Sequence, residues 1–282
     1  MTYYEVYKKG KNILKNVNNQ DFEFDAMVLL EYVFKLDKRK LIINSNHLAD
    51  KQNQKLYFNL INERANGRPL QYIIGEWEFM GLKFKVGEGV LIPRYDTECL
   101  IIEVAKIFEG KKKLKILDLC AGSGTVCISL ASKFCDSEVY AVEISDVAYD
   151  FLCYNIKMNR LSNVKAFRGN IFELPNYLSK NEKFDLIVSN PPYIQTKDID
   201  NLQKEVRLEP KIALDGGLDG LDFYRRIASF WKNYLKSDGT IAVEIGVGQS
   251  KDILNIFKKN GFNEILIKKD LNDIDRVVLA KF

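Results

Sequence analysis

Histidine is almost missing from the sequence: His47 is the only one among 282 residues. Serine–histidine–aspartate triads need an imidazole base, and many zinc sites need several histidine ligands. A single histidine argues against both kinds of site. We therefore expect no metal site, and we expect the chemistry of this protein to proceed without an imidazole base.

Paired cysteines are also missing, because the sequence contains no C-x-x-C motif. Five cysteines form an odd set that argues against a complete disulfide framework. We expect buried free thiols. The cysteines are Cys99, Cys120, Cys127, Cys135 and Cys153.

Long apolar runs are absent as well. No stretch approaches the ~18 residues that a membrane-spanning helix requires. The opening "MTYYEVYKKGKNILKN" lacks the apolar core of a signal peptide. We expect a cytoplasmic protein that makes no contact with a membrane.

The charge of the chain is nearly balanced, with a formal net value of +4. Residues 1–70 carry this excess, with 12 Lys and Arg against 8 Asp and Glu. Proteins that bind nucleic acids usually show a denser basic stripe. We therefore expect no direct contact with nucleic acid.

The chain divides into three parts by its hydrophobic pattern. Residues 1–70 have helical spacing and predict a small helical bundle, with one helix starting after Asp50. Residues 71–95 change to an alternating pattern with glycine turns, which predicts a β-hairpin linker. Residues 96–282 form the third part, a predicted catalytic domain.

From Lys113 onward, predicted strands and helices alternate. This alternation predicts an α/β fold with a Rossmann-like, mostly parallel sheet covered on both faces. The last two strands have no crossover helix between them, so we expect antiparallel pairing there. Such sheets bind ligands at the carboxyl ends of their strands. Residues 194–220 form a long irregular segment, which is typical of a functional lid.

The stretch "ILDLCAGSGTVC" joins the first strand of the alternating region to a helix. Gly122 and Gly124 permit close approach of a ligand to the backbone. Glu143 follows nineteen residues after Gly124, at the end of the next strand, where a carboxylate can accept hydrogen bonds from ribose hydroxyls. The pattern predicts a nucleoside site; the alternative is a tight turn with a solvated glutamate.

Two residues favour one nucleoside over the others. A dinucleotide fingerprint needs a third glycine, but Cys127 stands at that position. Asp118 precedes the loop, and its negative charge would repel a pyrophosphate and attract an ammonium group. S-adenosylmethionine contains an adenosine and an amino-acid head but no phosphate. The sequence therefore favours this methyl donor over NAD, and no ATP-binding P-loop is present.

The stretch "FDLIVSNPPYIQ" ends a strand at Ser189 with an amide and two prolines. Prolines cannot donate to a sheet ladder, so the chain must leave the sheet there. The side-chain oxygen of Asn190 and the carbonyl of Pro191 can accept the two hydrogens of a planar NH₂ group. Tyr193 can supply an aromatic wall. The alternative is an ordinary Asn-Pro turn.

The motifs "DLCAGSG", "AVEI" and "SNPPYI" resemble those of class I S-adenosylmethionine-dependent methyltransferases that modify planar nitrogens. The stretches "GRPLQYIIGEWEFMGLKFKVGEGVLIPRYDTE" and "EVRLEPKIALDGGLDGLDFYRRI" narrow the resemblance to the release factor glutamine methyltransferases, the HemK/PrmC family. This resemblance implies a donor site and a substrate site. The implied donor residues are Cys120, Ala121, Gly122, Ser123, Gly124, Glu143, Asn170 and Ile171, with Asn190 shared. The implied substrate residues are Asn190, Pro191, Pro192 and Tyr193.

The resemblance also implies a reaction and a partner. The methyl group would pass to the side-chain nitrogen of the glutamine in the Gly-Gly-Gln loop of peptide chain release factors. Residues 1–70 would help to recognise that protein, and the enzyme would act as a monomer. Three alternatives stay open: a glutamine methyltransferase of a ribosomal protein, an adenine or guanine methyltransferase of nucleic acid, and a nucleoside-sensing or scaffold protein without activity.

Overall fold

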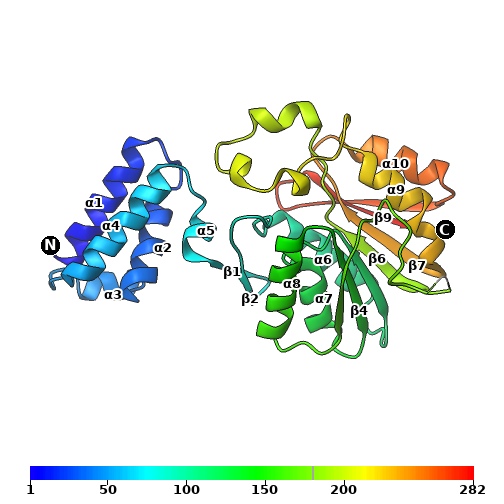
Figure 1. Ribbon diagram of the computed structural model, residues 1–282, viewed down its shortest axis with the longest axis horizontal. Coiled ribbons are helices and arrows are strands. Elements are labelled where there is room, and N and C mark those ends of the chain that lie inside the picture. Colours follow the sequence, from blue (N-terminus) through cyan, green and yellow to red (C-terminus); the bar gives the residue numbers. More distant parts are fainter. Residues whose placement is uncertain (180) are drawn as a thin grey trace. The chain divides into compact units, whose positions relative to one another are not determined.

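The computed structural model describes residues 1–179 and 181–282 (Figure 1). These residues form two compact units. The first unit contains Met1–Glu76 together with Lys204–Leu208, and the second contains Trp77–Gln203 together with Glu209–Phe282.

The first unit is a bundle of helices, as the sequence predicts. The predicted helix after Asp50 is α4, and the Asp50 carboxylate caps it by accepting a hydrogen bond of 2.8 Å from the backbone N–H of Asn53. Apolar side chains of α1, α2 and α4 form a buried core that includes Leu14, Leu29 and Ile61. The helices are α1 (Tyr3–Asn16), α2 (Phe22–Phe34), α3 (Lys38–Ile43), α4 (Lys51–Ala65) and α5 (Leu70–Ile74).

A buried arginine explains why a distant segment belongs to the first unit. Arg64 of α4 is only 5% exposed. Its Nε donates to Asp25 at 2.6 Å and one terminal nitrogen donates to Glu205 at 2.7 Å. A buried guanidinium needs such partners. Residues 204–208 lie within the predicted catalytic domain, residues 96–282, but they group with the helices in the structure.

The second unit contains a hairpin and a seven-stranded sheet. The sheet order is β5-β4-β3-β6-β7-β9-β8, and β9 runs in the direction opposite to the other six strands. This arrangement confirms the predicted Rossmann-like fold. The hairpin strands are β1 (Glu76–Phe79) and β2 (Leu82–Lys85), and the sheet strands are β3 (Lys115–Leu119), β4 (Glu138–Glu143), β5 (Val164–Arg168), β6 (Phe184–Ser189), β7 (Leu235–Glu244), β8 (Glu264–Lys269) and β9 (Asp275–Lys281).

Helices cover both faces of this sheet (Figure 1). One face packs against α6 (Asp96–Ile107), α7 (Thr125–Lys133) and α8 (Asp146–Met158), and the other packs against α9 (Asp222–Ser229) and α10 (Ser250–Lys259). The sequence predicts a single helix over residues 221–235, but α9 ends at Ser229. A 3₁₀ turn, Trp231–Tyr234, follows, and the fully buried Trp231 donates its indole N–H to the carbonyl of Ile171 at 3.0 Å.

The long irregular segment between β6 and α9 contains three short 3₁₀ turns: Thr196–Asn201, Val206–Leu208 and Lys211–Ala213. No helix among the described residues is long and apolar enough to span a membrane.

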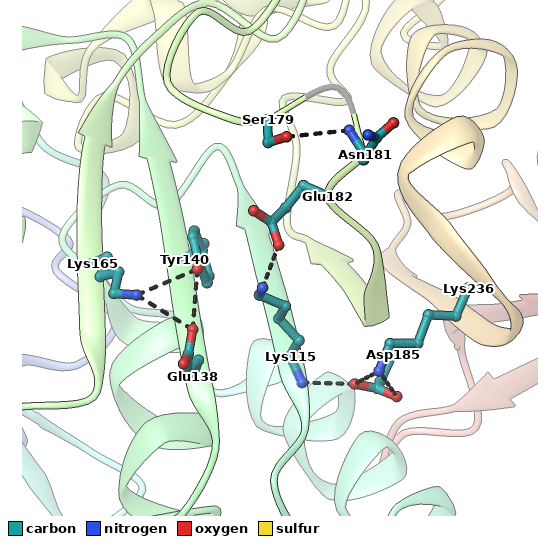
Figure 2. A network of polar contacts seen from close by, with 9 residues as sticks. All are labelled: Lys115, Glu138, Tyr140, Lys165, Ser179, Asn181, Glu182, Asp185 and Lys236. Carbon is teal, nitrogen blue, oxygen red and sulfur yellow. Dashed lines mark hydrogen bonds and ion pairs between the residues drawn. The ribbon is translucent and has the colours of Figure 1, made fainter.

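Charged side chains gather at the amino ends of the central strands (Figure 2). The Asp185 carboxylate accepts a hydrogen bond of 2.7 Å from the backbone N–H of Lys115 and pairs with Lys236 at 2.8 Å. The side chain of Lys115 forms an ion pair with Glu182. These contacts tie β3, β6 and β7 together at this end. The carboxyl ends of the strands are therefore the end left for a ligand site.

Candidate active site

A cavity of about 240 Å³ lies at the carboxyl ends of β3, β4 and β6. Seven of the residues predicted from the sequence line it: Cys120, Gly122, Glu143, Asn170, Ile171, Asn190 and Pro192. A smaller cavity of about 30 Å³ shares Cys120, Gly122 and Asn190 with the first and adds Ala121 and Ser123. The structure thus brings most of the predicted residues together.

Four predicted residues do not line either cavity as the described residues form them: Asp118, Gly124, Pro191 and Tyr193. Asp118 is 1% exposed, and its Oδ2 accepts a hydrogen bond of 3.0 Å from the backbone N–H of Cys127. Burial raises the pKa of Asp118 to about 8. Asp118 therefore holds the first turn of α7 beneath the glycine loop, and its contact with an ammonium group stays a prediction.

The glycine loop follows a left-handed path, with φ of 64° at Cys120 and 92° at Gly124. A Cβ at Gly124 would lie 2.6 Å from Leu152 Cδ1, so this position requires glycine. Asn155 of α8 is fully buried and donates from Nδ2 to the carbonyl of Ser123 at 2.9 Å. The same side chain accepts from the backbone N–H of Lys85 at 2.7 Å, so it fixes the loop against the hairpin.

Glu143 ends β4 with its carboxylate directed at the glycine loop. Its Oε2 accepts from the backbone N–H of Gly122 and its Oε1 from that of Ser145, both at 2.8 Å. Burial raises its pKa. Each carboxylate oxygen can accept more than one hydrogen bond. Glu143 is therefore held rigidly and can still accept hydrogens from a ligand.

The backbone at Asn170 and Ile171 is fixed from behind. Asn170 Oδ1 accepts from the N–H of Phe172 at 3.0 Å. The carbonyl of Ile171 accepts from Arg226 Nε at 2.8 Å as well as from the indole of Trp231. This part of the wall offers mainly apolar surface to the cavity.

Asn190 follows the last residue of β6 and lies on the walls of both cavities. Its Nδ2 donates to Thr97 Oγ1 at 3.0 Å, which leaves Oδ1 as the amide atom available to the cavity. Tyr193 is held from behind, because its carbonyl accepts from Gln249 Nε2 at 3.0 Å. Burial raises the pKa of Tyr193 to about 12, so it stays neutral.

Two further segments line the cavity. They are Gly89–Leu91 and the stretch containing Pro210, Ile212 and Ala213. No single residue in them was predicted as a site residue, although the second lies within the predicted lid, residues 194–220. Glu209 joins them: its Oε2 accepts from the backbone N–H of Ile92 at 3.0 Å, and it forms an ion pair with Arg94. Both segments lie in stretches that carry the family resemblance, but the pattern gives no sign that they meet.

Comparison with known proteins identifies the family. Residues 5–75 match the family model for the PrmC N-terminal domain, and residues 97–211 match the methyltransferase small domain. The release factor glutamine methyltransferase of Clostridium acetobutylicum is 42% identical over 274 residues, which cover 96% of this chain and 95% of that protein. This chain belongs to the release factor glutamine methyltransferase family.

Other relatives agree with that assignment. The release factor glutamine methyltransferase of Clostridium botulinum is 38% identical over 275 residues, covering 97% of this chain and 96% of that protein. The hMettl16 catalytic domain, solved in complex with the MAT2A 3′UTR hairpin 6, superimposes with a TM-score of 0.58 over 79% of this chain and 82% of that chain. Its 16% identity shows a common fold only. Within the described part of the chain, no cluster of side chains is suited to hold a metal ion.

Proposed function

We propose that this protein transfers a methyl group from S-adenosylmethionine to the side-chain nitrogen (N5) of the glutamine in the Gly-Gly-Gln loop of a peptide chain release factor. The observation that carries the proposal is Asn190, whose Oδ1 is available on the wall of a cavity that also contains Glu143. Family membership supports the same substrate.

The residues of the large cavity fit the methyl donor. Glu143 would accept the ribose hydroxyls, and Ile171 with Phe172 would cover the flat adenine while Asn170 lies at its edge. The glycine loop from Cys120 to Gly124 would pass along the amino-acid part. When bound, the donor supplies an activated methyl group: the new C–N bond forms as the C–S bond breaks, sulfur keeps the electron pair and one amide proton leaves to water.

Asn190 and Pro191 would hold the glutamine amide by accepting its two hydrogens. Amide nitrogen is a poor nucleophile because its lone pair is delocalised. Hydrogen bonds worth ~1–3 kcal/mol each cannot reverse that delocalisation. Alignment of the nitrogen with the methyl group can lower the barrier by ~7–11 kcal/mol. Pro192 on the cavity wall and the rigidly held Tyr193 would limit where the amide can sit.

The helical first unit would recognise the protein that carries the glutamine, and the enzyme would act as a monomer. A glutamine side chain alone offers too little surface to select one protein among many. Residues 1–70 are not needed to build the cavity, whose lining lies in the second unit. Their proposed task is therefore a second contact with the release factor.

The test compares substrates and then removes Asn190. Labelled S-adenosylmethionine is incubated with the enzyme and release factor, ribosomes, tRNA or DNA, and mass spectrometry locates the methyl group. We expect label only in the Gly-Gly-Gln peptide of the release factor. Asn190→Ala should abolish turnover while calorimetry shows donor binding largely intact, because its acceptor acts mainly in the transition state. Label in a ribosomal protein or nucleic acid would overturn the proposal.

A further inference from the structure

Thr97 occupies a position between the proposed catalytic amide and a buried acid. It is the second residue of α6 and is 2% exposed. Its Oγ1 accepts from Asn190 Nδ2 at 3.0 Å, and its side chain is close enough to the carboxylate of Glu244 to lower the pKa of Glu244 by hydrogen bonding. Thr97 therefore lies between the two side chains; it does not line the large cavity but does line the smaller one.

Glu244 is brought to this place by the sheet. It is the last residue of β7, and the pairing of Ser189 with Val243 sets it beside Asn190 on the neighbouring strand. Glu244 is 1% exposed, and its Oε2 has no hydrogen-bond partner among the described residues. A buried carboxylate oxygen without a hydrogen-bond partner is unfavourable, so it accepts a hydrogen bond from a donor within reach.

The direction of these hydrogen bonds follows from the number of hydrogens. A threonine hydroxyl has one hydrogen, and an ionised carboxylate can only accept. The Thr97 hydroxyl must therefore donate to Glu244, and its lone pair is left to accept from Asn190. The NH₂ group of Asn190 is thus held away from the cavity. With the amide reversed, Asn190 would present NH₂ to the NH₂ of a glutamine, and no hydrogen bond could form.

We propose that Thr97, oriented by Glu244, is a positioning residue that fixes which atom of the Asn190 amide faces the substrate. The inference rests on the proposed function, because Asn190 Oδ1 is useful only if the substrate donates a hydrogen bond to it, as a glutamine NH₂ group would. Thr97 lies outside the large cavity proposed for the donor, and its proposed effect on the substrate passes through Asn190. Glu244 acts one step further away.

The first experiment compares two substitutions that differ by a hydroxyl. Thr97→Val keeps the branched shape and loses the hydroxyl, whereas Thr97→Ser keeps the hydroxyl and loses the methyl group. We expect Thr97→Val to lower kcat for release factor about tenfold or more, as for one lost hydrogen bond to an important group. Donor affinity should stay within about twofold, because Thr97 lies outside the large cavity and valine keeps the shape that Thr97 gives to the wall of the smaller one. Thr97→Ser should restore most of kcat.

A second measurement reads the contact without catalysis. Protein labelled with ¹⁵N-asparagine gives a side-chain NH₂ signal for Asn190 that the Asn190→Ala variant identifies. In the wild type one of its two protons should exchange slowly because it is bound to Thr97, and Thr97→Val should abolish that protection. Glu244→Gln supplies an NH₂ group that can donate to Thr97, so that the Thr97 hydroxyl donates to Asn190 where it accepted before. This variant should therefore speed the exchange of the Asn190 NH₂ proton and lower kcat.

The outcomes separate this inference from the proposed function. If the wild type methylates release factor and Thr97→Val does so equally fast, the positioning role is wrong. Equal losses of kcat in Thr97→Val and Thr97→Ser would also overturn it, because they would point to packing. If the wild type does not methylate release factor, the proposed function fails. The NMR measurement still tests the inference in that case, because unchanged protection of the Asn190 NH₂ group in Thr97→Val would rule out the hydrogen bond between Asn190 and Thr97.

Discussion

At the scale of single residues, three acidic side chains at strand ends are buried, and their partners decide what each can do. Asp118 binds the first turn of a helix, Glu143 binds the glycine loop and Glu244 binds Thr97. Only Glu143 lines the large cavity. The three carboxylates look alike in the sequence, but they differ in whether a ligand can reach them.

We predict that turnover falls when Glu244 becomes protonated. Burial raises the pKa of Glu244 to about 7, while hydrogen bonding to Thr97 and the positive charge of Arg276 act in the opposite direction. The pKa is raised, so the ionised form prevails above about pH 7 and the protonated form below it. A protonated Glu244 can donate to Thr97, whose hydroxyl can then donate to Asn190 Oδ1 and turn the amide. The rate should therefore decrease as the pH falls through about 7.

The measurement is the single-turnover rate at saturating donor and release factor across this range. The charged groups that face Glu244 are Arg276 from β9, Asp96 from α6 and Arg94 from the preceding segment. Arg276 stays protonated at these pH values, because its pKa is raised above its already high ordinary value. Glu244→Gln should remove the step near pH 7. A wild-type rate that is the same on both sides of pH 7 would contradict the prediction.

We predict that Glu143→Gln weakens the binding of S-adenosylmethionine at least tenfold. An NH₂ group in place of one oxygen would face the backbone N–H of Gly122 or Ser145 and could not accept from it. The ligand would also lose a charged acceptor, and hydrogen bonds to a charged group contribute ~1.5–3 kcal/mol each. Calorimetry measures the affinity. Glu138→Gln is the control, because Glu138 begins the same strand and contacts Lys165 and Tyr140 at its far end. Equal affinities in the two variants would remove Glu143 from the donor site.

At the scale of elements, the hydrophobic pattern predicts the order and type of most helices and strands but not how the strands pair. The insertion of β9 between β7 and β8 is a tertiary property. The same limit applies to the site. Asn190 and Glu143 follow predicted strands, so their place could be inferred from the sheet rule. Thr97 and Glu209 contact residues 93 and 117 positions away, and no local pattern encodes such contacts.

We predict that the amino ends of the strands control stability and not ligand binding. Asp185→Asn should lower the free energy of unfolding by about 1–3 kcal/mol, because Lys115 N–H and the Lys236 ammonium lose a charged acceptor (Figure 2). Donor affinity should be unchanged, since the cavity lies at the other end of the strands. Urea unfolding and calorimetry give the two quantities, with the exposed Asp238→Asn as control. A loss of donor affinity equal to the loss of stability would contradict this separation.

At the scale of the whole molecule, the chain passes between the two units more than once. Residues 204–208 belong to the helical unit through the pairing of Glu205 with Arg64, and Pro210, two residues further along the chain, lines the cavity. A segment held by the helical unit is therefore continuous with the cavity wall.

The last prediction concerns the size of that substrate. A stable protein contact buries about 800 Å² per partner, and exposed apolar side chains often form its centre. Ile43 and Leu48 of the first unit are 78% and 79% exposed. We predict that Ile43→Ser combined with Leu48→Ser lowers kcat/KM for whole release factor but not for a short Gly-Gly-Gln peptide, which is too small to reach a second contact. Wild-type enzyme should also prefer the whole protein.

Leu266→Ser is the matched control for this pair, because Leu266 is an exposed apolar residue on β8 of the second unit. It should leave both substrates unaffected. Steady-state assays with each substrate, together with circular dichroism to confirm folding, supply the comparison. Equal kcat/KM values for release factor in the wild type and the double variant would remove this face of the helical unit from substrate recognition. If the wild-type enzyme has the same kcat/KM for the short peptide as for whole release factor, the whole helical unit has no role in substrate recognition, because no second contact is then needed.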